Sequence, residues 1–195
     1  CNGSAQLGRV YRNSETEPYI AVNPTNPDNM IAGWHQDRWS NGGAQGTPAA
    51  YSVDGGQTWT LANIPFTRCS GGASGSAGDF SRASDPWISF SPDGTAHYMA
   101  LVLNTENGEN GMAMARSGDG GVTWSEPQII KQSHAKGEKA RAAHHDKNSL
   151  TADPYDPDLV YATWTIFRNR KTTLVVARST DGGRTWGPAK PVNGF

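Results

Sequence analysis

Short stretches in which apolar and polar residues alternate recur along this chain, and they predict β-strands rather than helices. Three of them end in a proline within turn-forming residues, at 17–24, 85–92 and 147–154. Alternation with a period of two places one face of a strand in the core. Two more such stretches follow each of these: 30–35 and 48–53, then 96–103 and 111–116, then 159–167 and 172–178. Helical periodicity competes only at 135–143, which is short and polar.

An eight-residue motif that occurs three times comes after the third stretch of each repeat. It reads Ser-x-Asp-Gly-Gly-x-Thr-Trp and occupies 52–59, 117–124 and 179–186, at intervals of 65 and 62 residues. Its Asp can accept hydrogen bonds from nearby backbone N–H groups, and its glycines supply the positive φ angles of a tight turn. Its Thr and Trp are expected to begin a fourth strand and to bury the indole. The chain is therefore a repeat protein.

Four antiparallel strands in roughly 60 residues make one blade of a β-propeller. The fold class predicted is therefore all-β, with three blades at about 17–62, 85–128 and 147–191 after a lead-in at 1–16. Three blades do not close a ring, because propellers usually have four to eight. We expect the chain to be half of a six- or seven-bladed ring within a longer protein; the alternative is that two three-bladed chains complete one ring.

Composition agrees with a turn-rich β protein and argues against some partners. Hydrophobic residues make up 35% of the 195 residues, while Gly (23), Pro (12) and Trp (7) are abundant, so aromatic side chains carry much of the burial. A net charge of −1 provides no field that would recruit nucleic acid or an anionic membrane. No stretch is long and apolar enough for a transmembrane helix, and no cofactor motif is present.

The two cysteines bear on the cellular location. A single disulfide between Cys1 and Cys69 suits an exported protein. The alternative is that Cys1 is the lipidated first residue of a bacterial lipoprotein. Both interpretations predict a protein outside the cytoplasm, either secreted or at the cell surface or in the periplasm.

The repeated motif is that of the Asp-box, or BNR repeat, and from about residue 17 to 191 the chain resembles the sialidase-like β-propellers. The resemblance implies that the boxes stabilise the fold and lie on the side away from the substrate. Their residues are therefore expected to be structural: Asp54, Trp59, Asp119, Trp124, Asp181 and Trp186. It also implies an extracytoplasmic enzyme of the exo-α-sialidase type that acts on glycans.

Three charged residues open the innermost strands of the predicted blades. Glu17, Asp85 and Lys147 occupy equivalent positions in the three repeats, and propeller geometry would gather them at the mouth of the central channel. Charge at such a position is costly unless it is hydrated, paired or used to bind a ligand. The sequence is compatible with two roles for these residues, which are substrate binding and a rim of charges that are hydrated or paired with one another.

The segment 35–43, which we expect to be a glycine-rich loop between the second and third strands of the first blade with Trp39 exposed, contains the richest local cluster of candidate residues. His35, Arg38 and Trp39 suit sugar recognition, with the ring stacked on a sugar and the polar groups on its hydroxyls or carboxylate. The resemblance implies that Asp37 is the general acid and that Arg38 and Arg12 bind a carboxylate; a structural brace between Asp37 and Arg38 is the alternative. The sequence departs from the family after Tyr11-Arg12, because acidic residues at 15 and 17 would oppose an anionic substrate.

A second cluster precedes the third inner strand. His145, with Arg168 on a neighbouring loop, would suit a polysaccharide lyase, in which a histidine acts as base and cations neutralise a uronate. A metal site and a purely polar loop are alternatives, and we predict no metal. The leading hypothesis is a sialidase-like glycoside hydrolase for terminal acidic sugars. The alternatives are the lyase and a non-catalytic glycan-binding or assembly module, and the partners expected are a glycan and the remaining blades.

Overall fold

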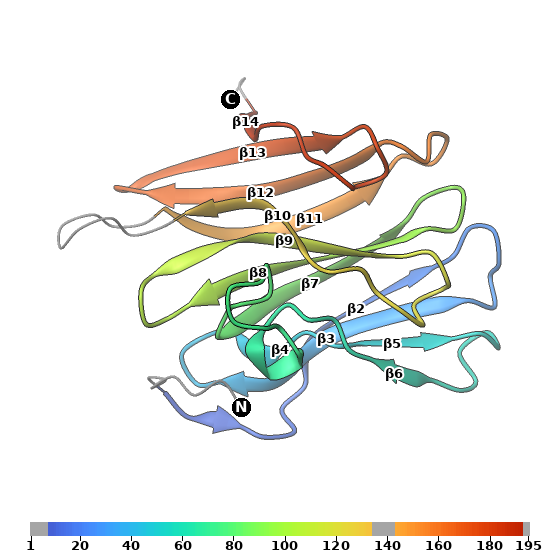
Figure 1. Cartoon of the computed structure of the whole chain (residues 1–195), viewed down its shortest axis with the longest axis horizontal. Coiled ribbons are helices and arrows are strands. Elements are labelled where there is room, and N and C mark those ends of the chain that lie inside the picture. The colour runs from blue at the N-terminus through green and yellow to red at the C-terminus, as the bar shows by residue number, and fades with distance from the viewer. Residues whose placement is uncertain (1–7, 134–142, 193–195) are drawn as a thin grey trace.

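The computed structural model describes residues 8–133 and 143–192, and within them the chain is almost entirely β-structure (Figure 1). The first blade orders its strands β2-β3-β5-β6, all antiparallel. Their bounds are β2 Thr16–Val22, β3 Met30–Trp39, β5 Ala49–Ser52 and β6 Thr60–Ala62. Two short strands, β1 Val10–Tyr11 and β4 Ala44–Gly46, pair with the outer part of β3.

The second and third blades repeat this order. The second contains β7 Arg82–Phe90, β8 Ala96–Asn104, β9 Glu109–Ser117 and β10 Gln128–Ser133. The third contains β11 His144–Ala152, β12 Val160–Arg168, β13 Lys171–Ser179 and β14 Lys190–Pro191. Figure 1 shows the three sheets side by side, with the second blade between the other two. The single bridge Ala44↔Ala83 joins β4 to β7, so the first two blades form one continuous sheet.

The Asp-box turns have the same internal geometry in all three blades. In the first, Asp54 accepts hydrogen bonds from the backbone N–H of Thr58 (2.9 Å), from its hydroxyl (2.6 Å) and from the hydroxyl of Ser52 (2.7 Å). Asp119 and Asp181 accept the equivalent set. These bonds to Thr58 and Ser52 lower the pKa of Asp54 to about 2, because each favours the ionised carboxylate.

The hydrophobic core lies between adjacent blades. One cluster of buried residues joins the first and second blades and includes Ile31, Phe66 and Tyr98. A second joins the second and third blades and centres on Met114 and the fully buried Trp164. Burying such side chains is worth about 1.5–3 kcal/mol each, so packing between adjacent blades contributes substantially to the stability of the arrangement.

The prediction of an all-β fold made of four-stranded blades is confirmed, with two local corrections. The fourth strand begins later than expected, at Thr60, Gln128 and Lys190, because the box Thr holds its turn instead of pairing in a ladder. The segment 35–39 is strand rather than loop, since β3 continues to Trp39. The possible helix at 135–143 and the disulfide or lipid at Cys1 involve residues outside the described ranges. Among the described residues, no helix has the length and apolar character needed to cross a membrane.

Candidate functional site

Each inner strand is interrupted at the same place by a residue with a left-handed backbone. The φ angles are +54° at Glu17, +52° at Asp85 and +55° at Lys147. The pairing with the next strand shifts at each of these residues, as in a β-bulge. A left-handed conformation costs a non-glycine residue roughly 1–2 kcal/mol. Strained positions of this kind cluster at functional sites, and here the strain recurs in three blades.

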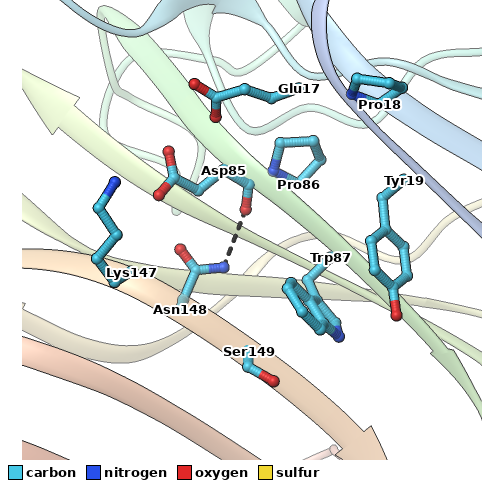
Figure 2. Close-up of a pocket in the computed structure, with 9 residues that line it drawn as sticks. All are labelled: Glu17, Pro18, Tyr19, Asp85, Pro86, Trp87, Lys147, Asn148 and Ser149. Atoms are coloured by element: carbon cyan, nitrogen blue, oxygen red, sulfur yellow. Dashed lines mark hydrogen bonds between the residues drawn. The ribbon is translucent and has the colours of Figure 1, made fainter.

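These three bulges meet around one pocket of about 430 Å³ (Figure 2). The structure thus brings together the three charged residues that the repeat alignment placed at equivalent positions. Each of them contributes itself and the next two residues to the lining: Glu17, Pro18 and Tyr19, then Asp85, Pro86 and Trp87, then Lys147, Asn148 and Ser149.

Tyr19 and Trp87 are pocket residues that the sequence analysis did not single out. Their rings lie against each other, with centroids 4.5 Å apart. They give the pocket an apolar surface beside its charged groups, as in sites that bind the C–H face of a sugar. The repeat alignment contained a signal for them, because both lie two residues after a strand-opening carboxylate.

Glu17 is electrostatically distinct from its neighbours. Burial and the nearby charge of Asp85 raise the pKa of Glu17, while Lys147 and Arg38 act more weakly in the opposite direction. A raised pKa keeps a carboxyl group protonated closer to neutral pH. Lys147 lies at the open side of the pocket: its side chain is 73% exposed, and Nζ is 3.7 Å from the Asp146 carboxylate.

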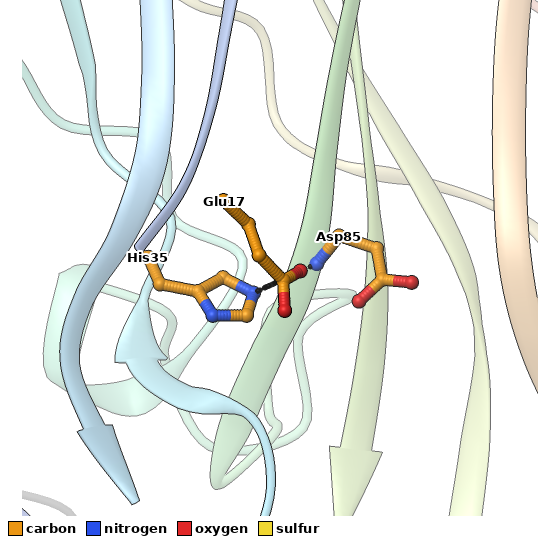
Figure 3. A group of neighbouring side chains, drawn as sticks. All are labelled: Glu17, His35 and Asp85. Carbon is orange, nitrogen blue, oxygen red and sulfur yellow. Dashed lines mark hydrogen bonds and ion pairs between the residues drawn. The ribbon is translucent and has the colours of Figure 1, made fainter. Parts of the chain in front are cut away.

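His35 lies beside Glu17 and links the first blade to the second by its contact with Asp85 (Figure 3). Its fully buried ring accepts the backbone N–H of Asp85 at Nε2 (2.9 Å) and contacts the Thr16 hydroxyl at Nδ1 (3.2 Å). Glu17 Oε2 lies 3.3 Å from the same Nε2. Burial, chiefly, lowers the pKa of His35 to about 4, so the ring is neutral at pH 7 and holds Asp85 in place.

The same three residues have the spacing of a cation site, with potential ligand atoms of Glu17, His35 and Asp85 within 4.8 Å of one another. However, the ring nitrogen that faces the carboxylates already accepts the Asp85 N–H. A metal ion would have to displace that hydrogen bond. That no metal binds stays a prediction.

The cluster at 35–43 does not lie as the sequence suggested. The expectation that Trp39 is exposed is wrong, because the residue is only 7% exposed and its ring lies beneath the Arg82 guanidinium, 4.3 Å away. This position does not favour the predicted stacking on a sugar. Asp37 does not line the pocket, and its carboxylate accepts the Asn13 backbone N–H (2.8 Å) and the Gln36 side chain (3.2 Å). Asp37 therefore braces the lead-in. Its predicted partner Arg38 donates instead to the Trp39 carbonyl (2.8 Å).

The predicted lyase residues do not come together at a pocket. His145 is fully buried, accepts the Trp164 indole N–H at Nδ1 (2.8 Å) and contacts the Ser133 hydroxyl at Nε2 (2.8 Å). Both ring nitrogens are thus engaged, and burial lowers the pKa of His145 to about 4. This arrangement does not support the predicted role of His145 as catalytic base, and that role stays a prediction. Arg168 is exposed where β12 turns into β13, and Arg12 is exposed between β1 and β2; neither lines the pocket.

A family model for the BNR/Asp-box repeat matches residues 50–61, which contain the first box. No curated protein sequence matches this chain. Among solved structures, an α-L-arabinanase of Penicillium chrysogenum is similar with a TM-score of 0.65 and 16% identity, over 93% of this chain and 50% of that one. The fold is a partial β-propeller of four-stranded blades.

Two further structures agree with this propeller fold. The α-L-arabinofuranosidase Arb93A of Fusarium graminearum has a TM-score of 0.65 and 14% identity, over 95% of this chain and 50% of that one. The Hadza microbial sialidase Hz136 has a TM-score of 0.60 and 20% identity, over 93% and 38%. At these identities the likeness shows the fold alone. The chain spans half or less of the length of these structures, and its three blades do not close a ring.

Proposed function

We propose that this propeller belongs to a glycoside hydrolase and that the pocket at Glu17, Asp85 and Lys147 binds the sugar. The observation that carries the proposal is the pair of carboxyl groups from successive blades, one of which has a raised pKa. Glycoside hydrolysis needs a carboxylic acid that stays protonated until it donates to the leaving oxygen. The solved structures of the same fold, which include an arabinanase and a sialidase, support this class of reaction.

Glu17 is the proton donor in this proposal, in place of Asp37. Its carboxyl group lies in the pocket, whereas the Asp37 carboxylate is occupied by the lead-in. Asp85 serves to raise the pKa of Glu17. It does not lie on the opposite side of the scissile bond, because its carboxyl group is hydrogen-bonded to that of Glu17, whereas the two catalytic carboxyl groups of glycosidases lie about 5–9.5 Å apart with the scissile bond between them. The nucleophile, or the base that activates water, comes from another blade.

The pocket also contains groups that would hold a sugar. Tyr19 and Trp87 supply an apolar face, and Lys147 supplies a cation at the open side. Asn148 donates to the Asp85 carbonyl (2.9 Å), while its buried Oδ1 has no hydrogen-bond partner in the described part of the chain. We further propose that the substrate is a terminal acidic sugar. This depends on Lys147 and Arg38, whose positive charges act on Glu17 and lower its pKa.

The test uses the complete protein with an unactivated glycan and with aryl glycosides of sialic acid and of arabinofuranose. Replacing Glu17 by Gln is expected to lower kcat on the unactivated glycan by about 10²–10⁴-fold. The loss should be much smaller on an aryl glycoside with a good leaving group, which does not need protonation. Asp37→Asn is the matched control and should change kcat by only a few-fold.

Three outcomes would contradict the proposal. An unchanged kcat in Glu17→Gln would remove Glu17 as the acid. Glycan binding by the wild type without turnover would favour a binding module. Ultraviolet absorbance from an unsaturated uronate product would favour a lyase. Hydrolysis of the arabinofuranoside but not of the sialoside would keep the reaction class and reject the acidic sugar.

A further inference from the structure

In the second and third Asp-boxes, the second of the two adjacent glycines packs against the preceding blade. Gly121, in the second box, is buried and has φ +97°. A Cβ atom added there would lie 2.8 Å from Cδ1 of Ile31 and 3.1 Å from Cβ of Tyr51, both in the first blade. A side chain at this position would force Ile31 to shift and would also have to adopt a positive φ, so both the contact and the backbone favour glycine.

The third box repeats the arrangement against the second blade. A Cβ atom added at Gly183 (φ +78°) would lie 2.8 Å from Cε of Met114, 3.2 Å from Nδ1 of His97 and 3.3 Å from Cδ of Arg116. The two contact sites are equivalent by strand register, since Ile31 pairs with Tyr51 and His97 pairs with Arg116. We call such a cross-strand pair the glycine socket of its blade. One member of the pair directly precedes the serine of the Asp-box, and the other lies opposite it on the neighbouring strand.

A polar contact accompanies each filled socket. In the first blade, Asn29 Nδ2 donates to the carbonyl of Gly120, the glycine that precedes Gly121 (2.9 Å). In the second blade, Arg116 Nη1 donates to the carbonyl of Gly182 (3.4 Å). The preceding glycine carbonyl is therefore fixed by a side chain of the socket blade in both cases.

The third blade has a socket at the equivalent position, and no described residue occupies it. Tyr161 pairs with Arg178 in the equivalent register. Arg178 is exposed and Tyr161 only half-buried, whereas Ile31 and His97 are completely buried in the filled sockets. Tyr161, Val176 and Arg178 line a pocket of about 490 Å³ on this face.

We propose that the Tyr161–Arg178 socket receives the second glycine of a fourth Asp-box, carried by a further blade of the same protein. Both filled sockets are occupied by the next box along the same chain, 65 or 62 residues after the previous one. Solved propellers of this fold are about twice as long as this chain. Arg178 takes the role of Arg116 and donates to the carbonyl of the preceding glycine. The fourth box lies about 62–65 residues beyond Gly183.

The experiment measures nitration of individual tyrosines by tetranitromethane in the complete protein. Tyr161 is expected to react at least tenfold more slowly than Tyr155, which is 91% exposed. Replacing the second glycine of the fourth box by Val is expected to raise the Tyr161 rate at least tenfold without changing Tyr155. Tyr98, completely buried, must stay unreactive in the variant, which shows that the chain remains folded.

Three results would overturn the proposal. The first is the lack of a Ser-x-Asp-Gly-Gly-x-Thr-Trp motif at the stated distance in the complete protein. The second is a Tyr161 rate that the glycine substitution does not change. The third is protection of Tyr161 that disappears on dilution, because this would assign the socket to a second copy of the chain.

Discussion

The two ends of each blade repeat in different ways. At the Asp-box end both sequence and geometry recur, since Asp54, Asp119 and Asp181 make the same bonds to a Thr and a Ser. At the pocket end only the backbone recurs. The inner strands share a left-handed residue at φ +52° to +55°, but the side chains there are those of a glutamate, an aspartate and a lysine.

This difference separates residues that stabilise the fold from residues that can act on a ligand. The Asp-box turn must form in every blade, and the same residues and hydrogen bonds form it each time. The shared bulge places three side chains at one pocket, and because the residue type can differ between blades, the pocket acquires an acid, a carboxylate and a cation. Stability should therefore respond to substitutions at the box end, and ligand chemistry to substitutions at the pocket end.

The largest expected effect is a loss of stability as the pH falls from 6.5 to 4. It involves histidines at both the pocket end and the Asp-box end of the blades. His35 at the pocket end, His97 at the box end and His145 have pKa values lowered from 6.5 to about 4, chiefly by burial. The unfolded chain binds protons there more readily than the folded one, so stability falls as the pH falls through this window. Together the three histidines should cost roughly 5–7 kcal/mol between pH 7 and pH 4.5, and urea unfolding at these two pH values would measure the loss.

The variant His97→Gln tells the two ends apart. It removes the box-end contribution, in which Arg116 also lowers the pKa and Asp93 raises it. The dependence on pH should become flatter by about a third. Glu17, whose pKa is raised, works in the opposite direction, because the folded state binds its proton more tightly. An unchanged dependence in His97→Gln would mean that this histidine is not buried and neutral.

Removing a box carboxylate comes next in size. Asp119→Ala deletes the acceptor for the Thr123 N–H and hydroxyl and for the Ser117 hydroxyl. Hydrogen bonds to charged groups contribute about 1.5–3 kcal/mol each and are not additive, so we expect a loss of about 3 kcal/mol in the free energy of unfolding. Exposed Glu126→Ala is the control and should change it by less than about 0.5 kcal/mol. Equal effects in both would contradict a structural role for the box.

Contact between blades can be separated from backbone strain with two glycines. Gly121→Ala and Gly75→Ala both place a Cβ atom on a residue with positive φ, but only Gly121 faces another blade, since nothing lies within 4 Å of the position at Gly75. Overpacking costs about 1–3 kcal/mol beyond the strain. Gly121→Ala should therefore be less stable than Gly75→Ala by about 2 kcal/mol in thermal or urea unfolding. Equal losses would remove the glycine socket as a source of stability.

The repeats predicted the strands, the boxes and the equivalence of the three pocket positions, because these depend on local sequence that occurs three times. The cluster at 35–43 could not be predicted in the same way. Trp39 is buried by Arg82, more than forty residues away, and Asp37 is engaged by Asn13, which lies in the lead-in. Such contacts between distant segments occur once in the chain and have no repeated pattern to reveal them.

The smallest expected effect tests whether the pocket-end backbone is strained independently of its side chain. Lys147 has φ +55°, and its exposed side chain makes one ion pair with Asp146, at 3.7 Å, which contributes little in water. Both Lys147→Ala and Lys147→Gly remove that pair. Only glycine also relieves the left-handed strain of roughly 1–2 kcal/mol, offset in part by its greater freedom in the unfolded chain.

The Gly variant should therefore be more stable than the Ala variant by about 0.5–1 kcal/mol in urea unfolding, while both lose the same affinity for an acidic sugar. This outcome would mean that the backbone conformation at Lys147 lowers the stability of the fold, whereas its side chain determines the affinity for the sugar. An Ala variant as stable as the Gly variant would mean that the bulge is unstrained, and the shared geometry of the three inner strands would then need no functional explanation.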